Sequence, residues 1–270
     1  MNICVTTTFL IFSCGLLNAQ ENKDVFLKWE MGVQLSACEQ KTPLEEMYGT
    51  SSYGWNDDFL FANHANDNSF VKHFAYGIKG LGVYHFNKNF FTRISGGFNI
   101  MSIEHSPEEY SDQNGLYLIT HDASKKRIDF LSAIGLGKRI SIDQFNFYSG
   151  FELPFVFYGK SSVHYFTELK DASSGTKNSS EELTGEIFGS LSMGIGNFAG
   201  FDFEFKNFSL GGEIAYLFQY CKSTSESNFQ IIEIDYVSNN TTVTNTKESP
   251  HISDFGFSKI KPSIHIMYSF

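Results

Sequence analysis

Three stretches of the sequence place a histidine beside a serine or an acidic residue, the side chains from which a Ser-His-acid hydrolase builds its nucleophile and base. They are His105 with Ser106, His121 with Asp122, and His164 with Ser161 or Ser162. Such neighbours arise readily by chance in serine-rich segments, and no catalytic motif surrounds them. The sequence therefore predicts no catalytic residues.

Acidic side chains gather in two polar segments and could contribute oxygen ligands to a divalent cation. They are Glu45, Glu46, Asp57 and Asp58 in one segment, and Glu108, Glu109 and Asp112 in the other. Neither segment has the ligand spacing and central glycine of a calcium-binding loop. We expect no metal site and no cofactor.

A third set of candidate functional residues consists of charged side chains that recur within otherwise apolar segments. Side chains of a strand alternate between its two faces, so each of these charges lies on the face opposite to an apolar ribbon. Charges of both signs enclosed together should pair, because an unpaired buried charge is costly. We expect a polar network inside the protein, made of Lys28, Glu30, Arg93, Asp129, Arg139, Glu152, Glu213, Lys261 and His265.

Eight segments with period-two alternation must position these charges. They span about 24–38, 71–86, 90–103, 125–140, 145–158, 184–205, 208–220 and 259–270. Turns of a few residues join three pairs of strands, whereas residues 39–70, 104–124, 159–183 and 222–254 are expected to be long polar loops. These loops carry 20 acidic and 6 basic residues, in a chain of net charge −10 that makes nucleic acid an improbable partner.

The final segment carries the most specific signal, because Ile264, Ile266, Tyr268 and Phe270 share one face. A strand that ends on an aromatic residue resembles the closing strand of small Gram-negative outer-membrane β-barrels, of the OmpA/OmpX-like or PorT-like kind. The resemblance implies an all-β, eight-stranded antiparallel up-and-down transmembrane barrel with short periplasmic turns and long extracellular loops. It also implies that Ile266, Tyr268 and Phe270 form a signal for the barrel-assembly machinery.

Residues 1–19 read as an export signal, with an apolar stretch before Leu17-Asn18-Ala19 and a barrel domain over 20–270. Lipoprotein processing at Cys14 is the rival interpretation. No later run of 18 apolar residues could form a spanning helix, so a membrane location requires a barrel.

Alternation alone does not tell which face points outward, and a soluble lipocalin-like barrel would bury the apolar face. The bulk of that face favours lipid, because packing so many Phe and Tyr side chains inside eight strands would leave little room for a ligand. Aromatic pairs near the turns, such as Phe86 with Phe90 and Phe205 with Phe208, are typical of a membrane-interface girdle.

By the resemblance, the function is that of a monomeric outer-membrane protein with a plugged polar lumen, in contact with outer-membrane lipid. Its acidic loops would serve envelope integrity or contact with a surface partner. Alternatives are a PorT-like accessory role in protein secretion, then a narrow pore, then a lipid-modifying enzyme. Cys38 and Cys221 lie near the same end of strands that are not neighbours, so a disulfide requires their loops to bend together.

Overall fold

The computed structural model describes residues 28–37, 71–111, 116–248, 252–257 and 260–270, which form 13 strands. The predicted export signal lies outside these residues. All strand pairs are antiparallel. None of the described residues belongs to a helix that could span a membrane.

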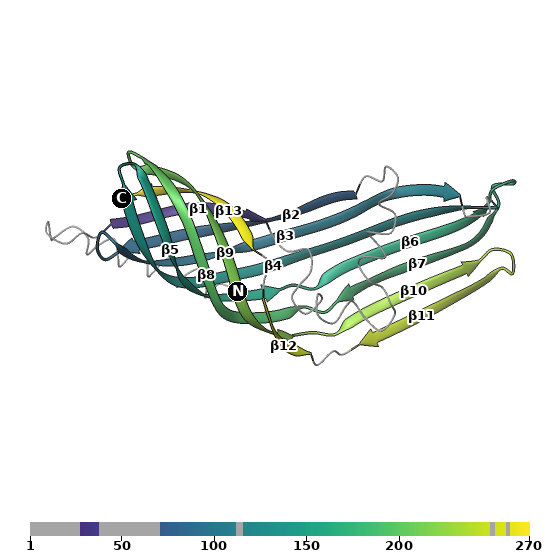
Figure 1. Ribbon diagram of the computed structural model, residues 1–270. Coiled ribbons are helices and arrows are strands. Elements are labelled where there is room, and N and C mark those ends of the chain that lie inside the picture. The colour runs from purple at the N-terminus through teal and green to yellow at the C-terminus, as the bar shows by residue number, and fades with distance from the viewer. Residues whose placement is uncertain (1–27, 38–70, 112–115, 249–251, 258–259) are drawn as a thin grey trace.

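Eight strands pair in a ring, in which each strand has two neighbours and the last returns to the first. In ring order they are β1 (Lys28–Ala37), β2 (Val71–His85), β3 (Phe90–Ser111), β4 (Tyr117–Ile142), β5 (Phe145–Tyr158), β8 (Ser190–Phe205), β9 (Phe208–Ser223) and β13 (Lys261–Ser269). The β4–β5 and β1–β13 pairs close the ring. In Figure 1, β5, β8 and β9 cross in front of β1 to β4.

A second part of the sheet continues beyond the ring, and we call it the extension. It consists of β6 (Ser161–Asp171), β7 (Lys177–Ile187), β10 (Ser227–Asp235), β11 (Asn240–Glu248) and the outer parts of β3 and β4. β4 joins the two parts, because residues 129–142 pair with β5 whereas residues 117–126 pair with β6. Figure 1 shows the extension running away from the ring. The short β12 (Ser253–Phe257) continues the line of β13 along β9.

The extension corrects the expectation of long loops. Residues 104–124, 159–183 and 222–254 are mostly strand, while residues 39–70 lie outside the described part of the chain. The reason is that these strands carry polar residues on both faces, so their sequence lacks the apolar alternation that marks a half-buried strand. The segment expected as one strand over 184–205 is also two strands, β7 and β8, interrupted at Phe188-Gly189.

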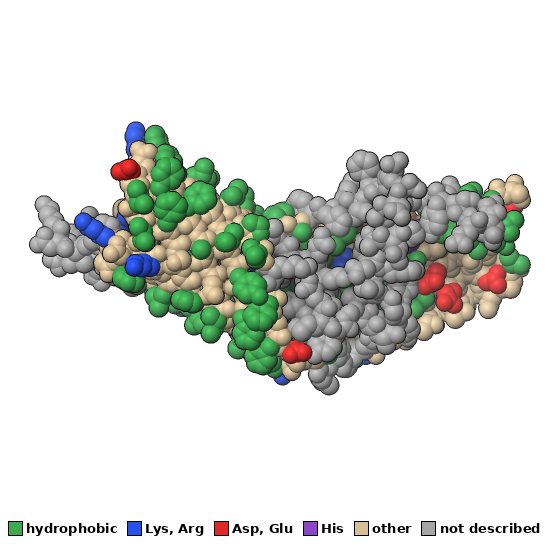
Figure 2. All heavy atoms as spheres, in the orientation of Figure 1, with side chains coloured by type: hydrophobic (Ala, Val, Ile, Leu, Met, Phe, Trp, Pro, Cys, Tyr) green, Lys and Arg blue, Asp and Glu red, His purple; other side chains and the backbone are tan. Residues whose placement is uncertain are grey.

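The two faces of the ring differ sharply in polarity. The outward positions are apolar and open, as in β5, where Phe147, Phe151 and Leu153 are 50%, 65% and 58% exposed. Inward positions of the same strand include the buried Glu152 and Asn146. Figure 2 shows hydrophobic side chains spread over the visible outer surface of the ring. The prediction that the apolar face points outward is confirmed.

Aromatic side chains collect at both ends of this apolar belt. At the end with the tight turns, the ring of Tyr268 lies 5.0 Å from that of Phe208 and 4.9 Å from that of Phe270. At the other end, Phe255 of β12 stacks on Phe218, with ring centroids 5.8 Å apart. The span of β9 from Phe208 to Phe218 comprises 11 residues, which matches the roughly 9–11 residues of a membrane-spanning β-strand.

Tight turns join the ring strands at one end. Asp143 and Lys206 adopt positive φ of 52° and 55°, as two-residue hairpins require. Between β2 and β3, Asn87 Oδ1 accepts hydrogen bonds from the backbone N–H groups of Asn89 and Phe90. These are the turns expected from the sequence.

One inward glycine shows why side chains are missing at some interior positions. A Cβ atom on Gly32 would lie 2.0 Å from the carbonyl oxygen of Ile266 on β13 and 2.5 Å from the sulfur of Met267. The close approach of β1 to β13 therefore requires glycine at this position.

Candidate functional site

The interior of the ring at the turn end holds a cluster of charges around Glu30. The Glu30 carboxylate lies 3.0 Å from Lys28 Nζ, 3.1 Å from Arg139 Nη1 and 3.3 Å from His85 Nε2. Glu204 of β8 completes the cluster, at 2.8 Å from Lys28 and 3.1 Å from Arg139. Each carboxylate thus faces at least two basic groups. These contacts compensate for the free-energy cost of removing the carboxylates from water.

A second interior cluster lies around Arg93, farther from the turns. Its two terminal nitrogens lie 2.5 Å from carboxylate oxygens of Glu213 and Glu152. The guanidinium carbon also lies 3.3 Å from the centre of the Phe198 ring, a cation–π geometry. Gln34 donates hydrogen bonds to Glu213 (3.2 Å) and Ser263 (2.6 Å). One buried network thereby connects β1, β3, β5, β9 and β13.

The remaining expected network residues occupy separate positions. His265 contacts the buried Asp202 of β8. Asp129 accepts a hydrogen bond from Arg127 Nε at 2.8 Å, and both are buried near the start of the extension. Lys261 lines a small cavity together with Lys79, Glu152 and Glu213. The nine residues therefore all face the interior but form several clusters.

Asp202 and Glu204 were missed as members of this network. Both alternate with Phe201, Phe203 and Phe205, so the period-two rule already placed them on the inward face. The alternation of this segment therefore carried the signal for both carboxylates.

Two small cavities remain between these clusters. One of about 30 Å³ is lined by Glu30, Arg93, Arg139 and Glu213 among others, and one of about 40 Å³ by Gln34, Lys79, Ser95 and Lys261 among others. Volumes of this size hold only a few water molecules.

The histidine neighbours with hydrolase-like side chains are not assembled into a triad within the part of the chain that the structure describes. His121 and Asp122 are consecutive in β4 and point to opposite faces. His164 Nε2 lies 3.2 Å from Glu182 on the neighbouring strand. The side chains of residues 105–111 and the acidic residues of 45–58 lie outside the part of the chain that the structure describes.

The residues that the resemblance implies as an assembly signal lie at the turn end of β13 and just after it. Ile266, Tyr268 and Phe270 are 58%, 36% and 63% exposed on the outer face. The backbone N–H of Phe270 donates a 3.0 Å hydrogen bond to the carbonyl of Trp29, which holds the end of the chain against β1. Cys221 is fully buried inside, and Cys38 lies outside the described residues.

The extension carries its own charged groups. Glu168 contacts Lys177 and lies 3.1 Å from Lys170; a hydrogen bond from Lys177 lowers the pKa of the Glu168 carboxyl. In the turn after β6, hydrogen bonds from the Ser173 hydroxyl and from Ser174 lower the pKa of Asp171 to about 2. These contacts fix the β6–β7 hairpin.

One acidic pair in the extension is unfavourable. Glu181 of β7 stands directly opposite Glu233 of β10. Burial, and then the negative charge of Glu233, raise the pKa of the Glu181 carboxyl. Like charges at directly opposite positions of neighbouring strands destabilise a sheet.

These features together define the class of protein. A ring of antiparallel strands with an apolar outer face, two aromatic girdles and a charged interior is a transmembrane β-barrel of the outer-membrane kind. In such barrels the tight turns face the periplasm and the longer segments face the outside of the cell. The extension accordingly lies on the extracellular side.

Comparison with protein-family models found no match, and comparison with curated proteins found no related sequence. Solved structures that align with the chain include the outer membrane protein OprG from Pseudomonas aeruginosa, at 11% identity and a TM-score of 0.39, over 90% of this chain and 95% of that one. A major outer membrane protein from Thermus thermophilus aligns at 11% identity and a TM-score of 0.31, over 91% of this chain and all of that one. With similarities this low, the class rests on the barrel's own geometry.

Proposed function

We propose that the protein is an outer-membrane anchor with a plugged lumen, whose extracellular sheet makes contacts at the cell surface. The observation that carries this proposal is the extension, because a barrel that served only to span the membrane would not need paired strands well beyond the apolar belt. Its contact chemistry follows from its charge and from its free edge.

The plugged lumen is supported by the ion pairs that cross it. Arg93 links β3 to β5 and β9, and Arg139 links β4 to β1 and β8. An eight-stranded barrel has an interior just wide enough for side chains to fill. With cavities of only about 30 and 40 Å³ between these clusters, the interior supports anchoring better than transport.

The extension is acidic. β6, β7, β10 and β11 contain eight Asp and Glu residues against three Lys. Figure 2 shows acidic side chains on its visible surface. The Glu181–Glu233 pair would be relieved by a cationic group placed nearby. A basic partner therefore complements this sheet.

The edge of the sheet supplies a way to bind that partner. Among the strands that the structure describes, β11 pairs only with β10. Its sequence, Asn-Thr-Thr-Val-Thr-Asn-Thr-Lys-Glu, contains no proline, and β-branched residues of this kind favour strands. An exposed edge of this type accepts an extended peptide as an additional strand. We expect the partner to present an extended, basic segment.

The test removes the edge without touching the barrel. Ser227 and Glu248 are register partners, so residues 228–247 can be replaced by a two-residue turn that joins them. The full protein and this variant, both in lipid nanodiscs, are compared for binding to an array of extended Lys- and Arg-containing peptides. Binding by the full protein that the variant loses supports the proposal. Equal binding by both, or discrete single-channel conductance of the full protein in planar bilayers, contradicts it.

A further inference from the structure

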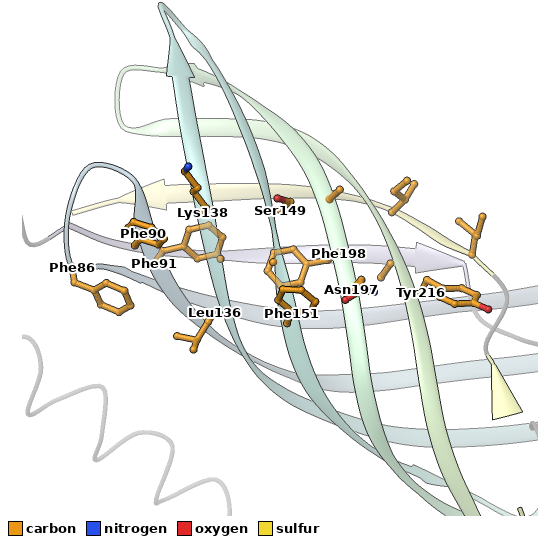
Figure 3. Close-up of a pocket in the computed structure, with 16 residues that line it drawn as sticks. Phe86, Phe90, Phe91, Leu136, Lys138, Ser149, Phe151, Asn197, Phe198 and Tyr216 are labelled. Atoms are coloured by element: carbon orange, nitrogen blue, oxygen red, sulfur yellow. The ribbon is translucent and has the colours of Figure 1, made fainter. Parts of the chain in front are cut away.

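A groove of about 1010 Å³ crosses the outer surface of the barrel. It runs over β3, β4, β5, β8 and β9 and ends at Ile260, just before β13 (Figure 3). Its volume lies at the upper end of the roughly 300–1,000 Å³ of small-molecule sites. Most lining side chains are apolar and outward-facing, including Leu136, Phe151, Ile214 and Tyr216.

Two glycines of the inward face lie behind the groove. Gly137 and Gly150 are register partners on β4 and β5. A Cβ atom on Gly137 would lie 2.3 Å from the ring of Phe91, and one on Gly150 would lie 2.5 Å from the ring of Phe198. The two interior rings therefore pack directly against the backbone of the wall behind the groove.

Three polar side chains interrupt the apolar lining. Lys138, Ser149 and Asn197 are all exposed on the lipid-facing side and come from β4, β5 and β8. Lys138 pairs in register with Ser149, and Asn197 pairs with Phe151, so the three form a diagonal line across the strands. No carboxylate of the described residues forms an ion pair with Lys138. Polar groups that face lipid are costly and mark functional positions.

The line of polar residues has a direction relative to the membrane. Lys138 lies four residues before the periplasmic end of β4 at Ile142. Tyr216, at the other end of the groove, lies eight residues beyond the periplasmic start of β9 at Phe208. The groove thus runs from the periplasmic side, where its cation lies, across the apolar belt to Tyr216, two residues before Phe218 of the opposite aromatic girdle.

We propose that this groove binds one phospholipid of the periplasmic leaflet. Its anionic phosphate pairs with Lys138, its ester region accepts hydrogen bonds from Ser149 and Asn197, and an acyl chain follows Phe151 and Ile214. The order of these contacts, from charged through polar to apolar, matches the order of groups in a phospholipid that stands in this leaflet. The assignment is independent of the role proposed for the extension.

The experiment is native mass spectrometry of the full protein, released from vesicles of equal phosphatidylglycerol and phosphatidylcholine. We expect one retained lipid, with phosphatidylglycerol preferred. Lys138→Gln should reduce that preference about fivefold, the effect of one basic residue at an anionic membrane surface. Lys88→Gln is the matched control, since Lys88 lies in a periplasmic turn outside the groove, and it should leave the preference unchanged.

A second variant tests the groove itself. Ala199→Leu fills the floor from a lipid-facing position where added apolar bulk is compatible with folding, and it should remove the retained lipid. A gel-mobility shift on boiling verifies that each variant is folded. Equal retention of both lipids, no effect of Lys138→Gln, or retention of lipid through Ala199→Leu would overturn the proposal. So would preferential retention of lipid A, the outer-leaflet lipid, when it is added to the mixture.

Discussion

Arg93 and Glu213 lie 120 residues apart in the chain, yet Arg93 Nη1 lies 2.5 Å from a carboxylate oxygen of Glu213 inside the barrel. Both side chains are buried, at 6% exposure each. The contact joins β3 to β9 across the lumen, and the same guanidinium holds Glu152 of β5. Removal of the cation alone would leave two buried carboxylates without their ion-pair partner.

Arg93→Met should therefore lower the unfolding free energy in lipid vesicles by about 3–5 kcal/mol, the cost of breaking a buried ion pair from one side. Adding Glu152→Gln and Glu213→Gln to the same chain should recover most of this loss, because the carboxylates are then neutral. The triple variant is the decisive comparison. If it were as unstable as Arg93→Met, packing against Phe198 and not charge would explain the loss.

The role of the final aromatic residue in assembly can be separated from its contribution to the surface. Phe270→Ala should strongly reduce the folded yield in cells, because the terminal strand is proposed as the assembly signal. Phe205→Ala is the control, since Phe205 is 61% exposed at a periplasmic turn and Phe270 is 63% exposed. Folded protein is quantified by the gel-mobility shift on boiling. Equal yields for the two variants would show that Phe270 acts only as one more lipid-facing aromatic.

The acidic pair in the extension gives a pH-dependent prediction. Burial and the charge of Glu233 raise the pKa of the Glu181 carboxyl. The folded extension therefore binds a proton at Glu181 more tightly than the unfolded chain does. Its stability should thus increase as the pH falls through that pKa and decrease as the pH rises. Glu181→Gln should remove this dependence and stabilise the extension at neutral pH by about 0.2–1 kcal/mol.

Hydrogen exchange of the β7 and β10 amides measures this local stability. Glu186→Gln is the control, because Glu186 lies 2.7 Å from Lys160 and carries a favourable contact. It should leave exchange unchanged or make it faster. Faster exchange in Glu181→Gln than in Glu186→Gln would mean that Glu181 stabilises the sheet.

The barrel could be predicted from the sequence because its strands obey a strong physical rule. Lipid on one side and a charged interior on the other force strict alternation, as in Phe147, Phe151 and Leu153 against Asn146 and Glu152. Of the nine charges that the same rule assigns to the interior, seven are buried and Lys28 and Lys261 are half-buried. The alternation rule does not identify which of these charges form ion pairs. The pairing of Arg93 with Glu213 depends on the register of the strands around the ring.

The extension could not be found by that rule. Both faces of β11 meet water, so Thr242 and Thr244 on one face alternate with Thr241 and Val243 on the other, without an apolar period. Its strands are held by backbone pairing and by turns such as the one fixed by Asp171. A polar, threonine-rich segment therefore reads as a loop although it folds as a sheet.

The central claim is that the exposed apolar belt of the ring faces lipid, and two arginine substitutions test it most directly. Ile134 of β4 and Val243 of β11 are both β-branched strand residues, 56% and 52% exposed. Ile134 lies in the belt, whereas Val243 lies in the extension. The measurement is the unfolding free energy of each variant in phospholipid vesicles. We expect Ile134→Arg to cost about 2–4 kcal/mol, as arginine does at the bilayer midplane, and Val243→Arg to cost about 0–1 kcal/mol, as it does near or beyond the interface. Equal and small costs at both positions would contradict the account, because the belt would then face water.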